Sequence, residues 1–225
     1  STLKAFFDGD KDPFIEAVAG ISLCIKPGET FAIVGESGSG KTTLARALSG
    51  LATAQAGDIL YRDSLSQETQ IRGASDRQLQ PLRSEISMMF QDPIGSLSPR
   101  MTVKSLITEP FKIQGIRDVD IDKEAQRLLA MVGLAPFFAD RYPFQLSGGQ
   151  ARRVGVARAL ALSPKLIIAD EPTAGLDVSV QGEILNLLGQ LQSDHNISLI
   201  IITHNLQVIR HISDRMGIMY LGKFI

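Results

Sequence analysis

The stretch GESGSGKTT, from Gly35 to Thr43, constrains this chain more than any other part of the sequence. The apolar run 30–34 precedes it and helix-forming residues 44–48 follow it, so we expect a strand, a glycine-rich turn and a helix. The spacing fits G-x-x-x-x-G-K-[ST], in which backbone N–H groups and a helix N-terminus hold phosphate. A turn without a ligand is the plainer alternative, but the agreement of all these features favours a nucleoside triphosphate site.

Each residue type in this phosphate loop has a chemical reason. Gly35, Gly38 and Gly40 let successive N–H groups turn inward around an anion. Lys41 supplies a cation for the β and γ phosphates, and the Thr42 hydroxyl is an oxygen ligand for Mg²⁺. The full set of predicted nucleotide contacts in the loop is Gly35, Glu36, Ser37, Gly38, Ser39, Gly40, Lys41, Thr42 and Thr43.

Composition sets broad limits on the function. With 225 residues, 44% hydrophobic and 21% charged, the chain suits one large globular domain. The 23 basic and 24 acidic residues give a net charge of -1, which provides no electrostatic case for binding nucleic acid. The single cysteine, Cys24, excludes an intrachain disulfide and is expected to be a small core residue. Without a signal peptide or a long apolar run, we expect a protein that is soluble and cytosolic by itself.

Strand-like and helix-like patterns alternate along the chain, which predicts a mostly parallel sheet with the nucleotide at the carboxyl ends of its strands. A polar loop is expected at 62–74, a hairpin turn at 222–223, and a truncated C-terminus after it. The expected strands are 14–25, 30–34, 57–61, 86–90, 166–170, 198–203 and 216–221. One expected helix is capped by Ser75 and reaches 83, one is capped by Thr102 and runs through 107, and one is capped by Asp122 and ends before Gly133. Two more span 151–162 and 179–191, and a last stripe is formed by Leu206, Ile209 and Ile212.

Polar residues follow several of the expected strands. Asp170 and Glu171 close the strand 166–170, where Asp170 would hold Mg²⁺ and Glu171 would polarise the attacking water. Gln91 follows another strand and can contact Mg²⁺ or its water without adding charge. His204 follows a third and can orient the water of Glu171. Taken singly, an acidic pair or a histidine at a strand end is more often structural, so these roles depend on the phosphate loop.

The segment LSGGQ, residues 146–150, precedes a predicted helix. Ser147, Gly148 and Gly149 would form a second anion-binding helix N-terminus. A second phosphate site in one molecule suggests a site shared between two copies. A glycine turn that only caps a helix is the alternative for these five residues in isolation.

Together these motifs resemble, in identity and order, the nucleotide-binding domain of ABC ATPases over nearly the whole chain. The motifs are the Walker A loop 35–42, the Q-loop Gln91, the signature 146–150, Walker B 166–171, the D-loop 174–177 and the switch His204. The resemblance implies an α/β fold with a P-loop NTPase core, an N-terminal antiparallel β subdomain and an inserted α-helical subdomain. It implies one domain over 1–225, with the core at 1–91 and 161–225 and the helical subdomain at 92–160.

The same resemblance implies ATP and Mg²⁺ as cofactors and two domains packed head to tail, with each ATP between one Walker A loop and the partner's signature. An N-terminal aromatic residue would stack on adenine, with Phe7 as the first candidate and Phe14 as the second. The residues assigned to catalysis are Lys41, Gln91, Glu171 and His204; to the metal, Thr42, Gln91 and Asp170; and to the partner's nucleotide, Ser147, Gly148, Gly149, Gln150 and Asp177.

Three longer stretches resemble a narrower group, the oligopeptide/dipeptide importer ATPases: FQDPIGSLSPRMTV (90–103), DEPTAGLDVSVQ (170–181) and RMGIMYLGK (215–223). That group includes importers of peptides, antimicrobial peptides, nickel and some sugars. The resemblance implies an ATPase that powers such an importer from the cytoplasmic face of the inner membrane. Its partners would be a second, identical or related domain, permease subunits and, indirectly, a solute-binding protein. The chain departs from these relatives in Ala151-Arg152-Arg153, where they more often have a polar residue and then Gln-Arg, and in Asn205, where Asp is usual.

Two other functions are compatible with the same fold. A soluble ABC ATPase that acts on the ribosome or on DNA usually carries paired domains with a charged linker, or long coiled coils, and this sequence shows neither. A regulatory module that binds ATP without hydrolysing it is the other alternative. The presence of Lys41, Asp170, Glu171 and His204 argues against that alternative.

Overall fold

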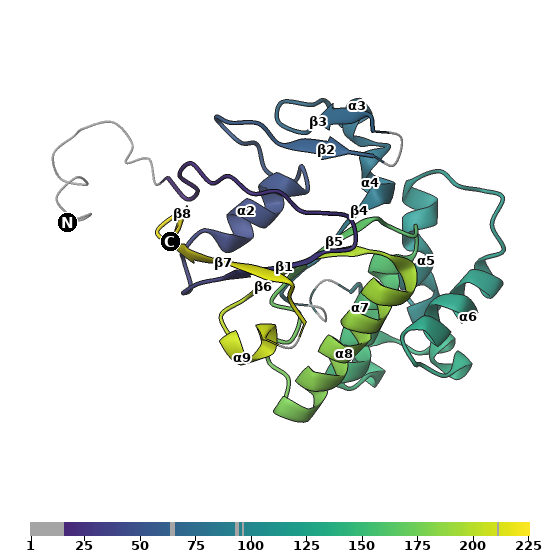
Figure 1. Cartoon of the computed structure of the whole chain (residues 1–225). Coiled ribbons are helices and arrows are strands. Elements are labelled where there is room, and N and C mark those ends of the chain that lie inside the picture. Colours follow the sequence, from purple (N-terminus) through teal and green to yellow (C-terminus); the bar gives the residue numbers. More distant parts are fainter. Residues whose placement is uncertain (1–15, 64–65, 93–94, 96, 211) are drawn as a thin grey trace, which may run out of the picture.

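The computed structural model describes residues 16–63, 66–92, 95, 97–210 and 212–225 of the chain. Its centre is a six-stranded sheet with the strand order β4-β5-β6-β1-β7-β8 (Figure 1). The first five strands in this order run parallel, and only the β7–β8 pair is antiparallel, which confirms the predicted sheet. The strands are β4 Ile86–Met89, β5 Leu166–Asp170, β6 Ser198–Thr203, β1 Thr30–Val34, β7 Arg215–Tyr220 and β8 Lys223–Phe224.

Side chains of the central strands alternate between two apolar layers, as the two-residue period of a strand requires. Helix α2 (Lys41–Leu48) covers one face of the sheet and α8 (Val178–His195) covers the other (Figure 1). In β5 and β6, the residues in the α2 layer are Ile168, Ile200 and Ile202, and those in the α8 layer are Ile167, Ala169, Leu199 and Ile201. Burial on both faces explains why these strands are almost continuously apolar.

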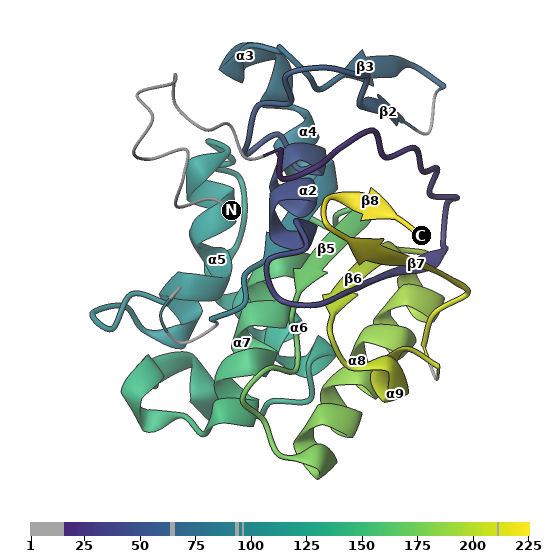
Figure 2. The ribbon, with the colours of Figure 1, turned by 90° about the vertical axis from the view of Figure 1, so that its left-hand side faces the viewer.

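Three further helices form a group beside the β4 edge of the sheet: α5 (Val103–Ile113), α6 (Ile121–Met131) and α7 (Gly148–Leu160) (Figure 2). Two short 3₁₀ helices, Pro136–Asp140 and Pro143–Gln145, lie between α6 and α7. Leucines and valines of these helices join the apolar layer that contains α8. The largest fully buried side chains of the group are Leu106, Ile107, Leu128, Leu129 and Leu160.

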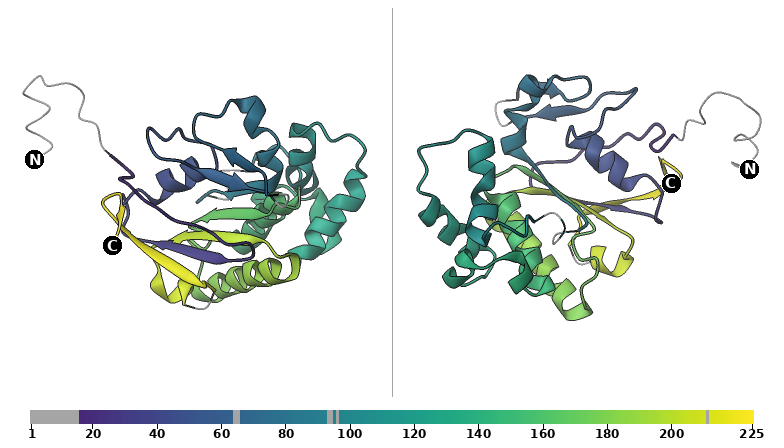
Figure 3. Two further views of the ribbon diagram at one scale, coloured as in Figure 1. Left: turned by 45° about the horizontal axis from the view of Figure 1, so that its top comes forward. Right: turned by 180° about the vertical axis from the view of Figure 1, so that it is seen from behind.

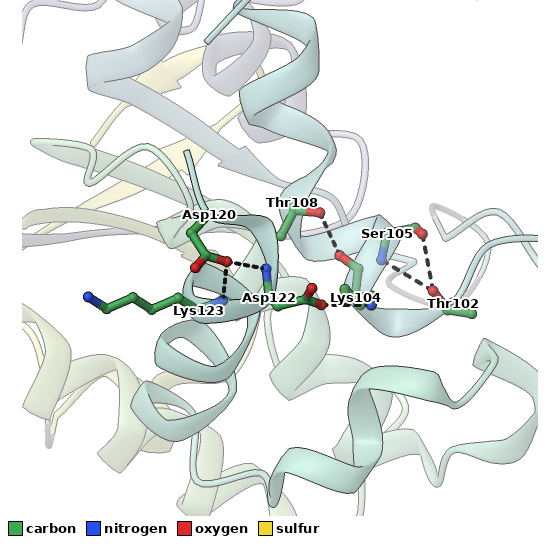
Figure 4. A network of polar contacts seen from close by, with 7 residues as sticks. All are labelled: Thr102, Lys104, Ser105, Thr108, Asp120, Asp122 and Lys123. Atoms are coloured by element: carbon green, nitrogen blue, oxygen red, sulfur yellow. Dashed lines mark hydrogen bonds and ion pairs between the residues drawn. The ribbon is translucent and has the colours of Figure 1, made fainter. Parts of the chain in front are cut away.

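Polar caps fix where α5 and α6 begin (Figure 4). The Thr102 hydroxyl accepts a hydrogen bond from Ser105 N at 3.3 Å, as predicted. Asp120, rather than Asp122, caps α6, because its Oδ1 accepts from the backbone amides of residues 122 and 123 at 3.1 Å. The freed Asp122 carboxylate instead bonds Lys104 Nζ at 2.8 Å and so joins the two helices.

The remaining predicted helix ends differ by a few residues. Helix α5 continues past Ile107 and through Pro110, because Phe111 is also buried and extends the apolar face. Helix α7 begins at Gly148 instead of 151, and α8 extends to His195. The helix capped by Ser75 breaks at Pro81 into α3 (Asp76–Leu79) and α4 (Leu82–Glu85).

A second, two-stranded antiparallel sheet lies on the α2 side of the main sheet (Figure 3). It pairs β2 (Leu60–Arg62) with β3 (Glu68–Gln70). The prediction of a loop throughout 62–74 is therefore wrong. The residues of β3 are polar and only partly buried, so they carry no apolar alternation that would have revealed a strand.

The predicted antiparallel strand over 14–25 is wrong from residue 16 onward, where the chain forms no strand. Gly20, at φ 68°, interrupts the extended path. The alternation in the sequence reflects burial alone, since Val18, Ile21, Leu23 and Ile25 pack against the core while Cys24 is exposed. Cys24 is therefore not the core residue that was predicted.

In the C-terminal part, β7 lies within one residue of the predicted strand 216–221, whereas the predicted helical stripe ends at Ile209 and does not reach Ile212. Ile209 of α9 (Leu206–Ile209) is buried, and β7 turns through Gly222 into β8. Among the described residues, no helix combines the length and the apolar character that crossing a membrane requires.

We predict that Leu188→Ala lowers the free energy of unfolding by about 2–5 kcal/mol, because it opens a cavity where α8 packs under the sheet. Urea unfolding followed by circular dichroism measures the change. Val178→Ala is the matched control in the same helix, since that side chain is 84% exposed, and it should change the value by less than 1 kcal/mol. Equal effects of the two substitutions would contradict the assigned packing of α8.

Candidate functional site

Parallel strands bring most of the predicted site residues to one edge of the sheet. The phosphate loop follows β1, Asp170 ends β5, Gln91 follows β4 and His204 follows β6. Because β6 lies between β5 and β1, the carboxylates and the loop face each other across a single strand. The sequence prediction of this shared edge is confirmed.

Glycine is required at two positions of the phosphate loop by close backbone contacts. A Cβ on Gly35 would lie 2.2 Å from Met219 O, and one on Gly40 would lie 2.0 Å from Ala17 O. Gly40 also adopts φ 102° and Gly38 adopts φ 80°, which disfavour other residues. The loop is thus shaped by the glycines in its sequence and by the chain segments behind it.

Lys41 lies inside the loop at the first turn of α2. Its ammonium donates to Gly35 O at 2.8 Å and to Glu36 O at 2.7 Å, and the residue is only 7% exposed. Burial lowers the pKa of Lys41, while the nearby Glu171 and Asp170 carboxylates oppose that decrease. Of the other loop residues, Ser39 is buried, Thr42 is partly buried, and Glu36, Ser37 and Thr43 are exposed.

The contacts of Asp170 leave one of its buried carboxylate oxygens available to a metal ion. Burial raises the pKa of its carboxyl, and a hydrogen bond with Thr42 opposes that increase. Its Oδ1 atom is buried and has no hydrogen-bond partner among the described residues. A buried, unpaired carboxylate oxygen beside a hydroxyl is a donor set that fits Mg²⁺.

The described residues alone do not supply a full metal shell. No group of three or more His, Cys, Asp or Glu side chains that could hold a metal occurs in the part of the chain that the structure describes. Mg²⁺ usually keeps several waters and takes phosphate oxygens beside one or two protein ligands. Thr42 and Asp170 therefore fit Mg²⁺ that is bound together with a triphosphate.

Glu171 and His204 are in direct contact. His204 Nδ1 lies 2.8 Å from Glu171 Oε1, with Glu171 only 9% exposed and His204 open to solvent. Glu171 adopts φ 50°, a left-handed conformation that is rare for a residue with a side chain and is often found at functional sites. The pair thus presents an oriented carboxylate next to Asp170.

The signature residues make contacts of their own. Ser147 caps α7, its Oγ accepting from Gln150 N at 3.2 Å while Gln150 Oε1 accepts from Ser147 N at 3.0 Å. A Cβ on Gly149 would lie 2.8 Å from Val180 Cγ1, so a glycine is needed where α7 meets α8. Ser147 and Gly148 are exposed, which leaves this helix start open to a ligand.

Two predicted residues have mainly structural contacts. Asp177 caps α8, because its Oδ1 accepts hydrogen bonds from Ser179 Oγ at 2.6 Å and from Val180 N at 3.0 Å. These bonds lower the pKa of the Asp177 carboxyl. The Gln91 carbonyl accepts a hydrogen bond from Arg152, and the residue is exposed at the end of β4. Both candidates for adenine stacking, Phe7 and Phe14, lie outside the described residues.

Arg152 is a residue that sequence reasoning missed as part of the site. It was noted only as a departure from related sequences. The signal was its position on α7, four residues before the buried Val156 and eight before the buried Leu160, which places a charged side chain on an apolar helix face.

Comparison with known proteins gives a consistent result. A family model described as "ABC transporter" matches residues 18–174. The chain is 46% identical over 213 residues to "Oligopeptide transport ATP-binding protein AppF" of Bacillus subtilis, covering 94% of this chain and 63% of that protein. It is 45% identical over 210 residues to "Oligopeptide transport ATP-binding protein OppF" of Escherichia coli, covering 92% and 61%. "Glutathione import ATP-binding protein GsiA" of Salmonella paratyphi A is 47% identical over 212 residues, covering 94% and 33%.

Solved structures are similar as well. The ATP-binding cassette MJ0796, in a dimeric post-hydrolysis state bound to ADP and Pi, superposes with a TM-score of 0.84 at 30% identity, covering 96% of this chain and 91% of that one. The protein cbiO1 from Clostridium perfringens superposes with a TM-score of 0.79 at 32% identity, covering 93% and 80%. The chain spans less than two thirds of the length of the relatives AppF and OppF.

We predict that Asp170→Asn stabilises the protein without nucleotide, by about 1 kcal/mol at neutral pH, because it removes a buried charge without a full set of partners. The pKa of Asp170 is raised in the folded protein, so its negative charge destabilises the folded state at pH values above that pKa. This destabilisation is lost as the pH falls toward the ordinary carboxyl value of 3.8. The gain should therefore shrink in acid.

Urea unfolding from neutral pH to pH 4, with and without Mg²⁺, measures this effect. Asp177→Asn is the matched control, because that carboxylate is exposed and asparagine caps a helix equally well. A variant that is less stable than the wild type at neutral pH, or that keeps a stabilisation by Mg²⁺-ATP equal to the wild type's, would rule out the assigned environment of Asp170.

Proposed function

Because this chain belongs to the ABC transporter family, we propose that it binds ATP with Mg²⁺ and hydrolyses it to drive a membrane importer. The observation that carries the proposal is the 2.8 Å contact between Glu171 Oε1 and His204 Nδ1. This contact lies at the sheet edge that also holds the phosphate loop and the unpaired Oδ1 of Asp170.

Hydrolysis joins a water oxygen to the γ-phosphorus and breaks the bond from that phosphorus to the β–γ bridging oxygen. Glu171 would accept a proton from the water, and the contact with His204 would hold the carboxylate in one orientation. Lys41 and the N–H groups of the loop would hold the phosphate oxygens. Mg²⁺, held by Thr42 and Asp170 with Gln91 at the next strand end, would offset negative charge on the phosphates.

We propose that the site is completed by a second domain, identical or related. The exposed N-terminus of α7, with Ser147 and Gly148, is the group that would meet the triphosphate held by the partner. The dimeric state of MJ0796 supports this arrangement. Asp177, next to the same interface at the start of α8, would contribute from the D-loop.

The class of transported solute is proposed from the relatives. Two are named as oligopeptide transport proteins and one as a glutathione import protein, which favours a peptide-type importer. The expected partners are permease subunits at the cytoplasmic face of the membrane and, indirectly, a solute-binding protein. Binding to vesicles that hold the permease subunits, rather than to ribosomes or DNA, would test this assignment.

We also propose the domain division with the helical subdomain at 92–160.

We predict that Glu171→Gln lowers ATP turnover by about 100-fold or more, because an amide cannot accept the proton, while ATP binding persists. The variant should form a stable dimer with Mg²⁺-ATP. Phosphate release and size-exclusion chromatography measure the two effects. Glu183→Gln, at an exposed position of α8, should keep wild-type turnover. Turnover of Glu171→Gln close to that of the wild type would remove Glu171 as the base.

We predict that Ser147→Arg abolishes turnover and ATP-dependent dimerisation but leaves ATP binding by the monomer intact. The added side chain would fill the start of α7, which belongs to the partner's site in this proposal. Fluorescent nucleotide titration and phosphate release separate the two properties. Ser193→Arg, at an exposed position near the end of α8, is the control. Loss of monomer binding in Ser147→Arg alone would show that the site is not shared.

A further inference from the structure

Arg152 is a buried cation that none of the proposed chemical steps uses. It lies in the second turn of α7, five residues after Ser147, and only 2% of the residue is exposed. A charged side chain at such a position costs free energy unless its surroundings compensate for the lost water. Its contacts therefore indicate what it is retained for.

The two ends of the guanidinium bond two different loops. Nη1 donates to Gln91 O at 3.1 Å, and Nη2 donates to Ala174 O at 2.7 Å. The Nε atom is buried without a hydrogen-bond partner among the described residues. Both acceptors are neutral carbonyls. Among the described residues Arg152 forms no ion pair, although the nearby Asp92 carboxylate opposes the decrease that burial causes in the pKa of Arg152.

These two carbonyls belong to the site edge. Gln91 lies two residues after the end of β4, and Ala174 closes the turn that starts at Glu171, where Ala174 N donates to Glu171 O at 3.1 Å. Glu171 is held there in its left-handed conformation, φ 50°. One side chain thus ties α7, the helix capped by Ser147, to the loop after β4 and to the turn after β5.

The geometry points to Arg152 as a positioning residue that fixes the Glu171–Ala174 turn and the Gln91 backbone relative to α7. It acts through Glu171 and does not touch the nucleotide. Loss of the Ala174 bond lets the turn relax and moves the carboxylate away from its productive orientation. Because the Arg152 guanidinium bonds the Glu171–Ala174 turn, a movement of α7 would also move this turn. The position of the helices α5–α7 and the orientation of the Glu171 carboxylate are therefore coupled. The expected effect on turnover rests on the proposed hydrolysis, whereas the restraint of the two backbone segments by Arg152 does not depend on it.

Arginine suits this task better than other residues. Its planar fork presents two N–H groups in a fixed geometry that spans two separate carbonyls, which a lysine point donor does not do. For stability alone, a buried charge with an unpaired Nε is a poor choice, since an apolar residue of similar size is often as stable. The presence of arginine at position 152 is therefore explained by the positioning of the Gln91 and Ala174 loops rather than by a gain in stability.

Arg153 provides a matched control in the next position of the same helix. It also donates from two ends, to Val132 O at 2.8 Å and to Glu183 Oε2 at 3.0 Å. Its partners lie at the end of α6 and on α8, away from the site loops. A substitution there removes a similar number of bonds without releasing Gln91 or Ala174.

The test compares Arg152→Met, Arg152→Lys and Arg153→Met. We expect Arg152→Met to lower kcat for ATP at least 10-fold, with KM within twofold of wild type. The kcat of Arg152→Lys should lie between those of Arg152→Met and the wild type. Arg153→Met should keep kcat within twofold. Hydrogen exchange of the nucleotide-free protein, followed on peptides that cover 86–92 and 170–177, should be faster in Arg152→Met and unchanged in Arg153→Met.

The inference is overturned if Arg152→Met keeps kcat within twofold, if Arg153→Met lowers kcat as much, or if exchange in 170–177 does not change. If Arg152→Met does not fold, as judged by circular dichroism, Arg152→Lys decides by the same kinetic and exchange readouts. If the wild-type protein shows no ATP turnover, the proposed function fails. The exchange comparison then still decides whether Arg152 restrains the two loops.

Discussion

The parallel pairing of β5, β6 and β1 is the constraint on which the rest of the structure depends. Parallel strands place all their carboxyl ends on one side, so four loops that are far apart in sequence meet at a single edge. The pairing is stable because each central strand is buried on both faces, by α2 and by α8 (Figure 1). The parallel direction of the strands thus brings the site residues together, and their side-chain chemistry depends on that arrangement.

The edge of the sheet holds charge where the remainder of the core is apolar. Lys41, Asp170, Glu171 and Arg152 are all buried or nearly so, and burial moves the pKa of Lys41 down and that of Asp170 up. Both directions mean that the folded protein disfavours the charged forms of these groups. A ligand that brings phosphate to the lysine and Mg²⁺ to the aspartate would compensate for both.

Much of the fold was predictable because its signals are local. The strands 166–170 and 198–203 were predicted with the observed limits, since a short, continuous apolar run bounded by polar residues has few other interpretations. The failures have a common origin in long-range contacts. Strand β3 has polar residues and exists through its partner β2, and residues 18–25 alternate in burial without forming a ladder.

The site shows the same division. Glycine and lysine spacing identified the phosphate loop, and strand ends identified Asp170 and Glu171. The sequence pattern predicted that His204 and Glu171 act on the same water, but it could not predict their direct contact, because 33 positions separate them. It also could not predict the two carbonyls that Arg152 joins, because they lie in two separate loops. Such contacts depend on how the sheet orders its strands.

The tight approach behind the phosphate loop also has a consequence for folding. Gly35 and Gly40 are pressed against backbone oxygens of Met219 and Ala17, and Gly222 N donates to Ser39 O at 3.0 Å. The motif is complete in sequence by residue 43, yet the part of its surroundings that Met219 and Gly222 supply arrives only with β7 and the β7–β8 turn. The contacts with Met219 and Gly222 span about 180 residues, and such distant pairs are the ones that form slowly. During synthesis, the most recognisable motif of the chain would therefore be among the last parts to reach its final form.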